Sequence, residues 1–299
     1  MPGIQTLSGA ATQANLRIGR AHGQALILSM VAILTRMFKR LIFRSKLLYS
    51  ACAIRLQPDR AMTDIFHTII LTARPAAGKS EVIDYLKKLP AAERRSRFHC
   101  GEIVEIDDFP YIWEKFEEDR ILDQAGRERL WTDKKLYFKE EWAWDFFLLK
   151  MNVAFQKHMA EGANGKTVLF EFARGGNNGI AHALDVVSPE VLTRAGILYI
   201  RVSYEESVRK NRRRFKPELA HSILYHSLPD DKMELYYKET DWPRIAPDLN
   251  GMISSQNVRI PYSVLVNEPE VTDDPKKLGP ALEAAMNTLW AACGDRQWQ

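Results

Sequence analysis

Residues 64–89, DIFHTIILTARPAAGKSEVIDYLKKL, decide the fold of this 299-residue chain. The first nine, DIFHTIILT, form an apolar and β-branched run that predicts a buried strand. The last ten, SEVIDYLKKL, carry apolar residues at helical spacing and predict an amphipathic helix. The residues ARPAAGKS (73–80) join the two. A buried strand, a short loop and a helix therefore follow one another without interruption.

The loop has most of the pattern G-x-x-x-x-G-K-[ST] of a phosphate-binding loop, or P-loop. Gly78, Lys79 and Ser80 provide its second half, whereas Ala73 occupies the first glycine position. In such a loop backbone N–H groups surround the phosphates, the lysine reaches the β- and γ-phosphates, and the hydroxyl lies on Mg²⁺. If position 73 needs a positive φ, its alanine costs about 1 kcal/mol or more. The residues expected to bind the nucleotide are Ala73, Arg74, Pro75, Ala76, Ala77, Gly78, Lys79 and Ser80.

The rest of the chain alternates between predicted strands and helices. Strands are predicted at residues 102–107, 167–172, 197–203 and 262–267, and helices at residues 113–124, 134–161, 205–215 and 276–292. Such alternation indicates βαβ units and a parallel sheet that helices cover on both faces. We therefore expect a three-layer α/β fold, built on a parallel five-stranded sheet, over residues 62–299.

Composition and charge exclude several classes of protein. Hydrophobic residues make up 46% and charged residues 27%, which argues against wholesale disorder, collagen and a polytopic membrane protein. The three cysteines lie far apart, so a disulfide framework is not expected and a reducing compartment is favoured. Residues 1–61 hold nine Lys/Arg and one acid, whereas residues 62–299 hold 33 bases and 37 acids. The body is therefore mildly acidic, and no nucleic-acid partner is expected.

The head, residues 1–61, leaves several interpretations open. Its longest apolar run, ALILSMVAIL at 25–34, is shorter than the roughly 20 residues that cross a bilayer. Residues 1–58 contain no Asp or Glu. An acid-free, Arg-bearing segment is typical of an organellar transit peptide, and a basic amphipathic helix would lie on a membrane surface. The sequence fits a secretory signal peptide less well. The simplest alternative is that translation starts at Met62 and the head is not native sequence. We expect a cytoplasmic body, with membrane contact only if the head is native.

The loop resembles the G-x-P-G-x-G-K-[ST] version found in P-loop kinases that act on small molecules. These include nucleoside monophosphate, shikimate and gluconate kinases and the zeta-toxin-like kinases. Pro75 matches this version, and Ala73 and Ala76 replace two of its glycines. The resemblance extends over about residues 62–292 as an arrangement of elements. It implies phosphoryl transfer from ATP, with Mg²⁺, to a small metabolite, nucleotide or nucleoside-like acceptor.

Carboxylates follow two of the predicted strands. Asp107 and Asp108 end the second strand, where several of these kinases place an acid that orients Mg²⁺ or takes the proton of the acceptor hydroxyl. Glu171, at the end of the third strand, resembles a carboxylate that acts on Mg²⁺ through water. The implied metal site is Ser80, Asp108 and Glu171. Arg174 follows the same strand, where the resemblance implies binding of the acceptor's anion; an ordinary salt bridge is the alternative.

Residues 197–215, ILYIRVSYEESVRKNRRRF, resemble the fourth strand and the lid-bearing helix of such kinases. Arg209, Arg212 and Arg213 are three and four residues apart, so they share one face of this helix. The resemblance implies a lid over about residues 209–242, with Arg209 and Arg213 in catalysis and Arg212 on the nucleotide. An arginine in this role contributes roughly 10³-fold in rate. A solvated basic helix end is the alternative.

An aromatic-rich helical cap over about residues 109–161 is the expected acceptor-binding insertion. Aromatic side chains at this spacing stack on a ring of the acceptor or, more commonly, pack the helices together. Two other functions stay open: an ATPase or nucleotide-dependent switch without an acceptor, and a non-catalytic nucleotide-binding protein, which the two alanines in the loop favour. Asn267 is not followed by the lysine of an Asn-Lys-x-Asp motif, which disfavours a guanine-specific GTPase.

Overall fold

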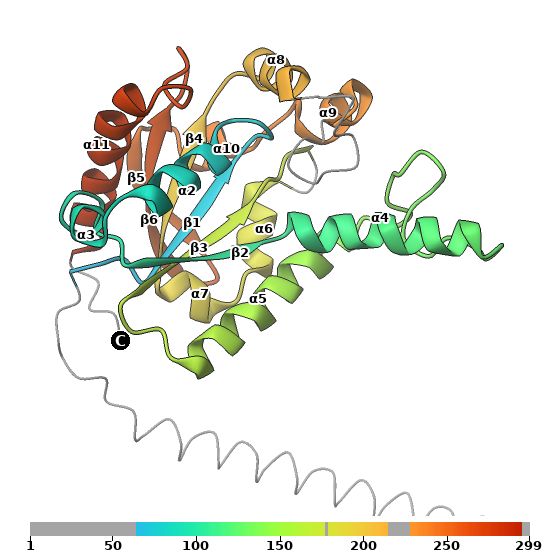
Figure 1. The fold of residues 1–299 in the computed structure, drawn as a ribbon, viewed down its shortest axis with the longest axis horizontal. Coiled ribbons are helices and arrows are strands. Elements are labelled where there is room, and N and C mark those ends of the chain that lie inside the picture. Colours follow the sequence, from blue (N-terminus) through green and yellow to red (C-terminus); the bar gives the residue numbers. More distant parts are fainter. Residues whose placement is uncertain (1–63, 177–178, 215–227, 295–299) are drawn as a thin grey trace, which may run out of the picture. The chain divides into compact units, whose positions relative to one another are not determined.

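A six-stranded sheet forms the centre of the computed structural model, which describes residues 64–176, 179–214 and 228–294 (Figure 1). Its strands are β1 (Thr68–Ala73), β2 (Glu102–Asp107), β3 (Lys166–Phe172), β4 (Ala195–Arg201), β5 (Asn250–Ser255) and β6 (Val258–Val266). Their spatial order is β2-β3-β1-β4-β6-β5. The first five in this order run parallel, and β5 pairs antiparallel with β6. The predicted α/β fold is confirmed, with one more strand than the predicted five.

The pattern of the sequence does not reveal the edge strand β5. Its residues, NGMISS, contain no run of β-branched or aromatic side chains. The strand forms because it pairs with β6 in a hairpin. Gln256 and Asn257 connect the two strands with φ angles of 50° and 63°, and such left-handed turns suit the twist of paired strands. Pairing with a neighbour, more than local preference, makes this segment a strand.

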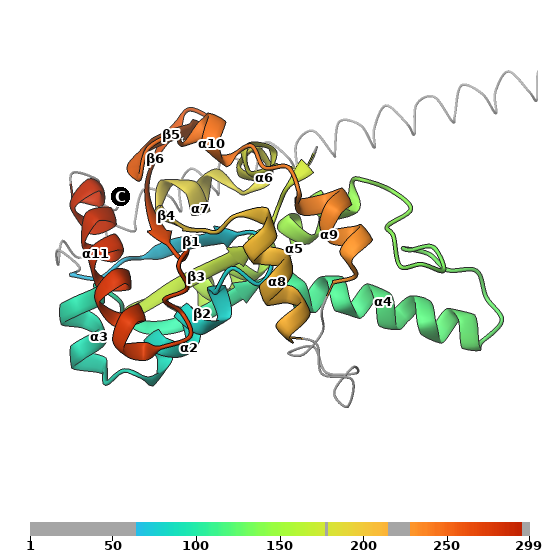
Figure 2. The ribbon, with the colours of Figure 1, turned by 90° about the horizontal axis from the view of Figure 1, so that it is seen from above.

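Helices cover the sheet on both faces (Figures 1 and 2). They are α2 (Lys79–Lys88), α3 (Ala91–Phe98), α4 (Phe109–Gln124), α5 (Ala143–Glu161), α6 (Ile180–Val186), α7 (Pro189–Thr193), α8 (Tyr204–Arg214), α9 (Asp230–Tyr237), α10 (Trp242–Ile245) and α11 (Pro275–Cys293). Apolar residues of α2, α3 and α11 form the core on one face, and those of α5, α6, α7 and α10 form the core on the other. The arrangement is the expected three layers.

The central strand β1 contributes apolar side chains to the cores on both faces of the sheet. All six of its residues are buried, between β3 on one side and β4 on the other. Successive side chains of a strand point to opposite faces. Ile70 accordingly joins the core under α5, whereas Ile69 and Leu71 join the core under α2 and α11. A continuous apolar run is therefore what a strand buried on both faces requires.

The second helix of the cap is shorter than predicted. The sequence pattern predicts a helix over residues 134–161, but α5 begins only at Ala143, and turns occupy residues 125–142. Contacts of Asp133 explain the difference, because its carboxylate accepts backbone hydrogen bonds from Lys135 (2.8 Å) and Tyr137 (2.9 Å), and Leu136 between them has a left-handed φ of 65°. A right-handed helix through residues 134–142 would exclude this turn.

Several predictions fall partly or wholly outside the described residues. The head, residues 1–61, lies outside them, as do residues 215–227 of the predicted lid. The described parts of the lid are α8 and α9, which lie at the same end of the sheet as the start of α4 (Figure 2). Within the described ranges, every helix is too short or too polar to cross a membrane.

Candidate active site

The phosphate-binding loop runs from the end of β1 to the start of α2. Ala73 is the last residue of β1, so its alanine has a strand conformation without left-handed strain. The left-handed positions are Ala76, with a φ of 55°, and Gly78, with a φ of 113°. The cost of alanine therefore falls on Ala76 and not on Ala73, at roughly 1–2 kcal/mol. Lys79 opens α2, so the free N–H groups of a helix N-terminus follow the loop directly.

Arg74 ties the loop to two other segments. Its guanidinium donates hydrogen bonds of 3.0 Å to the carbonyls of Val202, after β4, and of Tyr237 and Lys238, at the end of α9. The side chain of Arg74 therefore binds backbone carbonyls. The predicted contact of Arg74 with the nucleotide would come from its backbone. This tether brings α9 against the loop.

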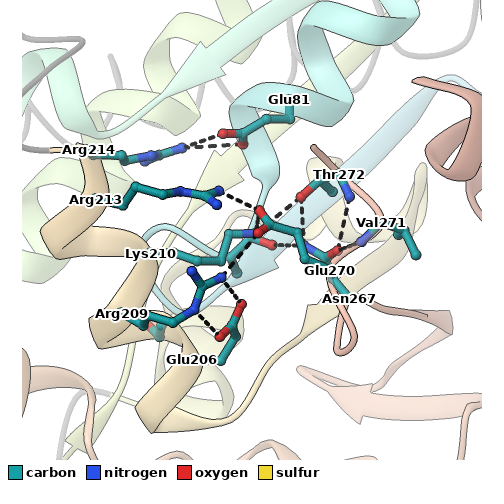
Figure 3. Close-up of polar contacts among 12 residues, drawn as sticks. Glu81, Glu206, Arg209, Lys210, Arg213, Arg214, Asn267, Glu270, Val271 and Thr272 are labelled. Carbon is teal, nitrogen blue, oxygen red and sulfur yellow. Dashed lines mark hydrogen bonds and ion pairs between the residues drawn. The ribbon is translucent and has the colours of Figure 1, made fainter. Parts of the chain in front are cut away.

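Asn267, which follows β6, supports the loop from the other side (Figure 3). Its Nδ2 donates to the carbonyl of Ala77 and to the hydroxyl of Thr272, both at 2.8 Å. Its Oδ1 accepts from the N–H groups of Val271 (2.7 Å) and Thr272 (3.1 Å). A Cβ added to Gly78 would lie 2.7 Å from Cγ2 of Thr272, so glycine is required for steric reasons as well as for its φ. Sequence reasoning missed this role, for which an asparagine after the last parallel strand was the available signal.

Lys79 meets two carboxylates at the carboxyl ends of β2 and β3. Its Nζ lies 3.6 Å from Oε1 of Glu171, and both residues are 9% exposed. Glu171 and Asp107 are register partners on these neighbouring strands. Burial, followed by the charges of Glu171 and Asp108, raises the pKa of Asp107 to about 8. Burial also raises the pKa of Glu171, although Lys79 opposes the effect. The site thus concentrates more negative charge than one lysine neutralises.

The next residue, Asp108, faces a different partner. It forms a buried ion pair with Arg174, and each of the two is 4% exposed. The guanidinium also donates to the carbonyls of Ala173 (2.7 Å) and Trp144 (3.1 Å), and it lies 5.1 Å from the centre of the Trp144 ring. Nε of Arg174 has no hydrogen-bond partner among the described residues. The predicted metal role of Asp108 therefore competes with this ion pair.

A pocket of about 260 Å³ opens beside Arg174. It lies between the start of the cap helix α5, the segment after β3, and α9. Its lining residues are Tyr137, Phe138, Glu141, Trp144, Ala173, Arg174, Gly175, Gly176, Leu235, Tyr236 and Tyr237. Asp108, the ion-pair partner of Arg174 in the pocket wall, directly follows Asp107 of the lysine–carboxylate group in the chain.

The arginines of α8 pair with several different carboxylates. Arg209 and Arg213 both reach the carboxylate of Glu270, at 3.1 Å and 2.8 Å (Figure 3). Arg212 instead pairs with Asp230 on α9 at 2.6 Å. The prediction placed all three on one face, and the structure brings only two of them together. Their side chains are about half exposed or more, so they are free to exchange partners.

A buried lysine joins these arginines to the loop support. Lys210 lies 2.8 Å from Glu270, and it donates to the hydroxyl of Thr272 at 3.1 Å (Figure 3). Thr272 in turn accepts from Asn267, which holds the P-loop. Sequence reasoning passed over this lysine because it stands among arginines on a strongly basic helix. It connects α8 to the phosphate-binding loop through polar contacts.

The residues present suit a nucleotide-bound Mg²⁺. No group of three or more His, Cys, Asp or Glu side chains in the described part of the chain is positioned to hold a metal ion. Mg²⁺ does not require one, because it takes phosphate and water oxygens together with one or two carboxylates. Ser80 is exposed on the first turn of α2, and a divalent cation would neutralise the charges of buried Glu171 and half-buried Asp107. Of the predicted metal residues, Ser80 and Glu171 fit this role better than Asp108.

Comparisons with known proteins give distant structural likenesses alone, among them the following two. No known family model matches the chain, and no curated protein sequence matches it. A gluconokinase from Sinorhizobium meliloti 1021 is similar in structure, with a TM-score of 0.40 and 12% identity over 78% of this chain and 99% of that one. A protein of the PezAT chromosomal toxin–antitoxin system of Streptococcus pneumoniae has a TM-score of 0.31 and 16% identity, over 72% of this chain and 78% of that one. Likenesses this distant do not identify an activity.

Proposed function

We propose that this chain transfers the terminal phosphoryl group of Mg-ATP to a hydroxyl group of a small molecule. One observation carries the proposal: Asp107 lies beside the P-loop lysine and Glu171, and the next residue, Asp108, pairs with Arg174 of the pocket. A phosphoryl donor on the loop and an acceptor in the pocket would therefore meet at these two consecutive carboxylates. Such proximity supplies much of the rate in phosphoryl transfer, which depends chiefly on positioning and charge.

Each residue at this meeting point has a role that its chemistry supports. Lys79 and the N–H groups at the start of α2 would bind the phosphates. Asp107 would accept the proton of the acceptor hydroxyl, and a carboxylate whose pKa is raised to about 8 is a stronger base than an ordinary one. Asp108 would act indirectly, by holding Arg174 in the wall of the pocket.

Ser80 and Glu171 would hold Mg²⁺ together with the phosphates. When bound there, the ion neutralises charge on the transferring group. Buried Glu171 also orients Lys79, whose Nζ lies 3.6 Å from its carboxylate. This assignment leaves Asp108 out of the metal site, because Asp108 already has a cationic partner.

Arg209 and Arg213 would complete the site. In this proposal they leave Glu270 for the phosphates when a nucleotide binds, whereas Arg212 acts less directly because it pairs with Asp230. Charge neutralisation by arginine lowers the barrier to phosphoryl transfer. Exposed ion pairs are weak enough to be exchanged in this way.

The test is ADP formation by the full chain with Mg-ATP, with and without a panel of nucleosides, nucleotides, sugars and sugar acids. ADP that appears only with one acceptor class supports a kinase. ADP formed equally without any acceptor supports the alternative of an ATPase or nucleotide-dependent switch. Nucleotide binding without turnover supports a non-catalytic nucleotide-binding protein.

A pair of lysine variants on one helix locates the activity. Lys79→Ala should lower transfer by a factor of about 10² or more, because the phosphates lose their side-chain cation. Lys88→Ala, on the exposed last turn of the same helix, should leave transfer unchanged. Circular dichroism checks that both variants are folded, and undiminished turnover in Lys79→Ala refutes the site.

A further inference from the structure

The pocket beside Arg174 is walled mainly by aromatic rings. Five of its eleven lining residues are aromatic: Tyr137, Phe138, Trp144, Tyr236 and Tyr237. Trp144 makes edge-on contacts with Phe138, at 5.2 Å between ring centres, and with Tyr236, at 5.3 Å. The walls therefore support one another before any ligand enters. A preformed aromatic wall favours a flat, unsaturated ring, which stacks on it with little loss of conformational freedom.

The pocket has no unpaired positive charge. Arg174 and Glu141 are the only charged residues in its lining, and the guanidinium is paired with buried Asp108. Another nearby cation, Lys232, lies 4.9 Å from the centre of the Tyr137 ring but donates to a backbone carbonyl and does not line the pocket. An acceptor with a phosphate or carboxylate group would meet no excess positive charge here, so its desolvation would go uncompensated.

Hydrogen-bonding side chains are scarce. The lining contains no Asn, Gln, Ser, Thr or His, and apart from its two charged residues only the tyrosines offer polar side-chain atoms. A polyhydroxylated sugar acid would lose its hydration and regain few hydrogen bonds.

Gly175 also packs closely on α9, where an added Cβ would lie 2.5 Å from the carbonyl of Tyr236. A larger side chain at position 175 would therefore clash with the backbone of α9.

We propose that the acceptor is an uncharged molecule with a flat, unsaturated ring and a hydroxyl group on a short arm, that is, a nucleoside and not a nucleotide or a sugar acid. This inference rests on the proposed function. The ring stacks on the aromatic wall, and Glu141 accepts a hydrogen bond at the mouth of the pocket. In the transfer, the acceptor oxygen bonds to the γ-phosphorus, the bond to the β-phosphate oxygen breaks with its electron pair leaving on ADP, and the hydroxyl proton passes to Asp107.

Binding of matched ligands to the full chain tests the inference. Isothermal titration is carried out with adenosine, guanosine, cytidine, uridine and thymidine, with the 5′-monophosphate of each, and with gluconate. At least one nucleoside should bind, its monophosphate should bind at least tenfold more weakly, and gluconate should not bind. Failure of every nucleoside to bind, or tighter binding of a monophosphate or of gluconate, overturns the inference.

Two variants locate the binding. Tyr236→Leu removes one aromatic wall and should weaken nucleoside binding at least tenfold, whereas Leu149→Ala, exposed on α5, should not change it. Binding of Mg-ADP should be the same in both, which shows that they fold. Unchanged nucleoside binding in Tyr236→Leu overturns the assignment to this pocket.

The binding measurement and the turnover measurement distinguish failure of this inference from failure of the proposed function. ADP formation with an anionic acceptor, without nucleoside binding, would leave the proposed function in place and remove this inference. Nucleoside binding without any ADP formation would leave a nucleoside site in the pocket and remove the proposed function.

Discussion

The side-chain amide of Asn267 donates a 2.8 Å hydrogen bond to the backbone carbonyl of Ala77, so a residue after the last strand holds the loop that follows the first. Asn267 is fully buried, and both of its polar atoms have two partners each. The shape of the phosphate-binding loop therefore depends on a segment 190 residues further along the chain.

Removing this amide should weaken both the fold and nucleotide binding. Asn267→Ala leaves buried polar groups of the loop without partners, which should lower the free energy of unfolding by about 1–3 kcal/mol. Urea unfolding measures the loss, and titration with Mg-ADP measures the affinity. Asn287→Ala, an exposed asparagine on α11, is the control and should stay within about 0.5 kcal/mol. Equal stability of the two variants would contradict the role of Asn267.

Neighbouring alanines in the loop should respond differently to glycine. Ala76 has a φ of 55°, whereas Ala77 is not left-handed, and both are buried. Ala77→Gly should lose about 1–1.5 kcal/mol, from backbone entropy and one buried methyl group. Ala76→Gly loses the same terms but regains roughly 1–2 kcal/mol of left-handed strain, so its stability should be nearly unchanged. Thermal or urea unfolding compares the two, and an equal loss in both would show that Ala76 is not strained.

The raised pKa of Asp107 predicts a pH-dependent stability in the absence of nucleotide and Mg²⁺. The folded protein holds a proton on Asp107 up to about pH 8, whereas the unfolded chain releases it near pH 4. The contribution of this group is therefore complete below pH 4 and is lost as the pH rises to 8.

Asp107→Asn removes that dependence. The variant should gain stability relative to the native chain between pH 5 and pH 8, on the order of 1 kcal/mol or more. Urea unfolding at both pH values measures the difference. A stability difference that is the same at pH 5 and pH 8 would show that the pKa of Asp107 is not raised.

The arginines of α8 should differ in their effect on turnover. Arg213→Gln should lower kcat by roughly 10²–10³-fold, because Arg213 stands with Arg209 at Glu270 next to the loop support. Arg212→Gln should lower it much less, because Arg212 is directed to Asp230 on α9. Steady-state kinetics with the acceptor found in the panel measures both. Equal losses of kcat would contradict this difference, and would mean that α8 rotates when the nucleotide binds and directs all of its arginines to the phosphates.

The phosphate-binding loop and the parallel sheet could be predicted because their signals are local. An apolar β-branched run, a loop ending in Gly-Lys-Ser and an apolar helical spacing lie within 26 consecutive residues. Carboxylates at the ends of the second and third predicted strands were also a local signal. The pairing of β2 with β3, which places Asp107 opposite Glu171, is a result of the tertiary structure.

Partnerships between distant side chains were decided only by the tertiary structure. Asp108 and Asp107 are adjacent in sequence and chemically identical, yet one pairs with Arg174, 66 residues away, and the other lies beside Glu171. Arg212 and Arg213 diverge in the same way, towards Asp230 and Glu270.

The amino-acid sequence alone determined the strand–loop–helix unit, the three layers and the chemical types gathered at the strand ends, because periodicity and short motifs act over a few residues. Packing determined the edge strand β5, the late start of α5, the position of strain at Ala76 and the aromatic pocket. These depend on which segments come together when the core is buried, and a choice among partners dozens of residues apart leaves no periodic signal in the chain.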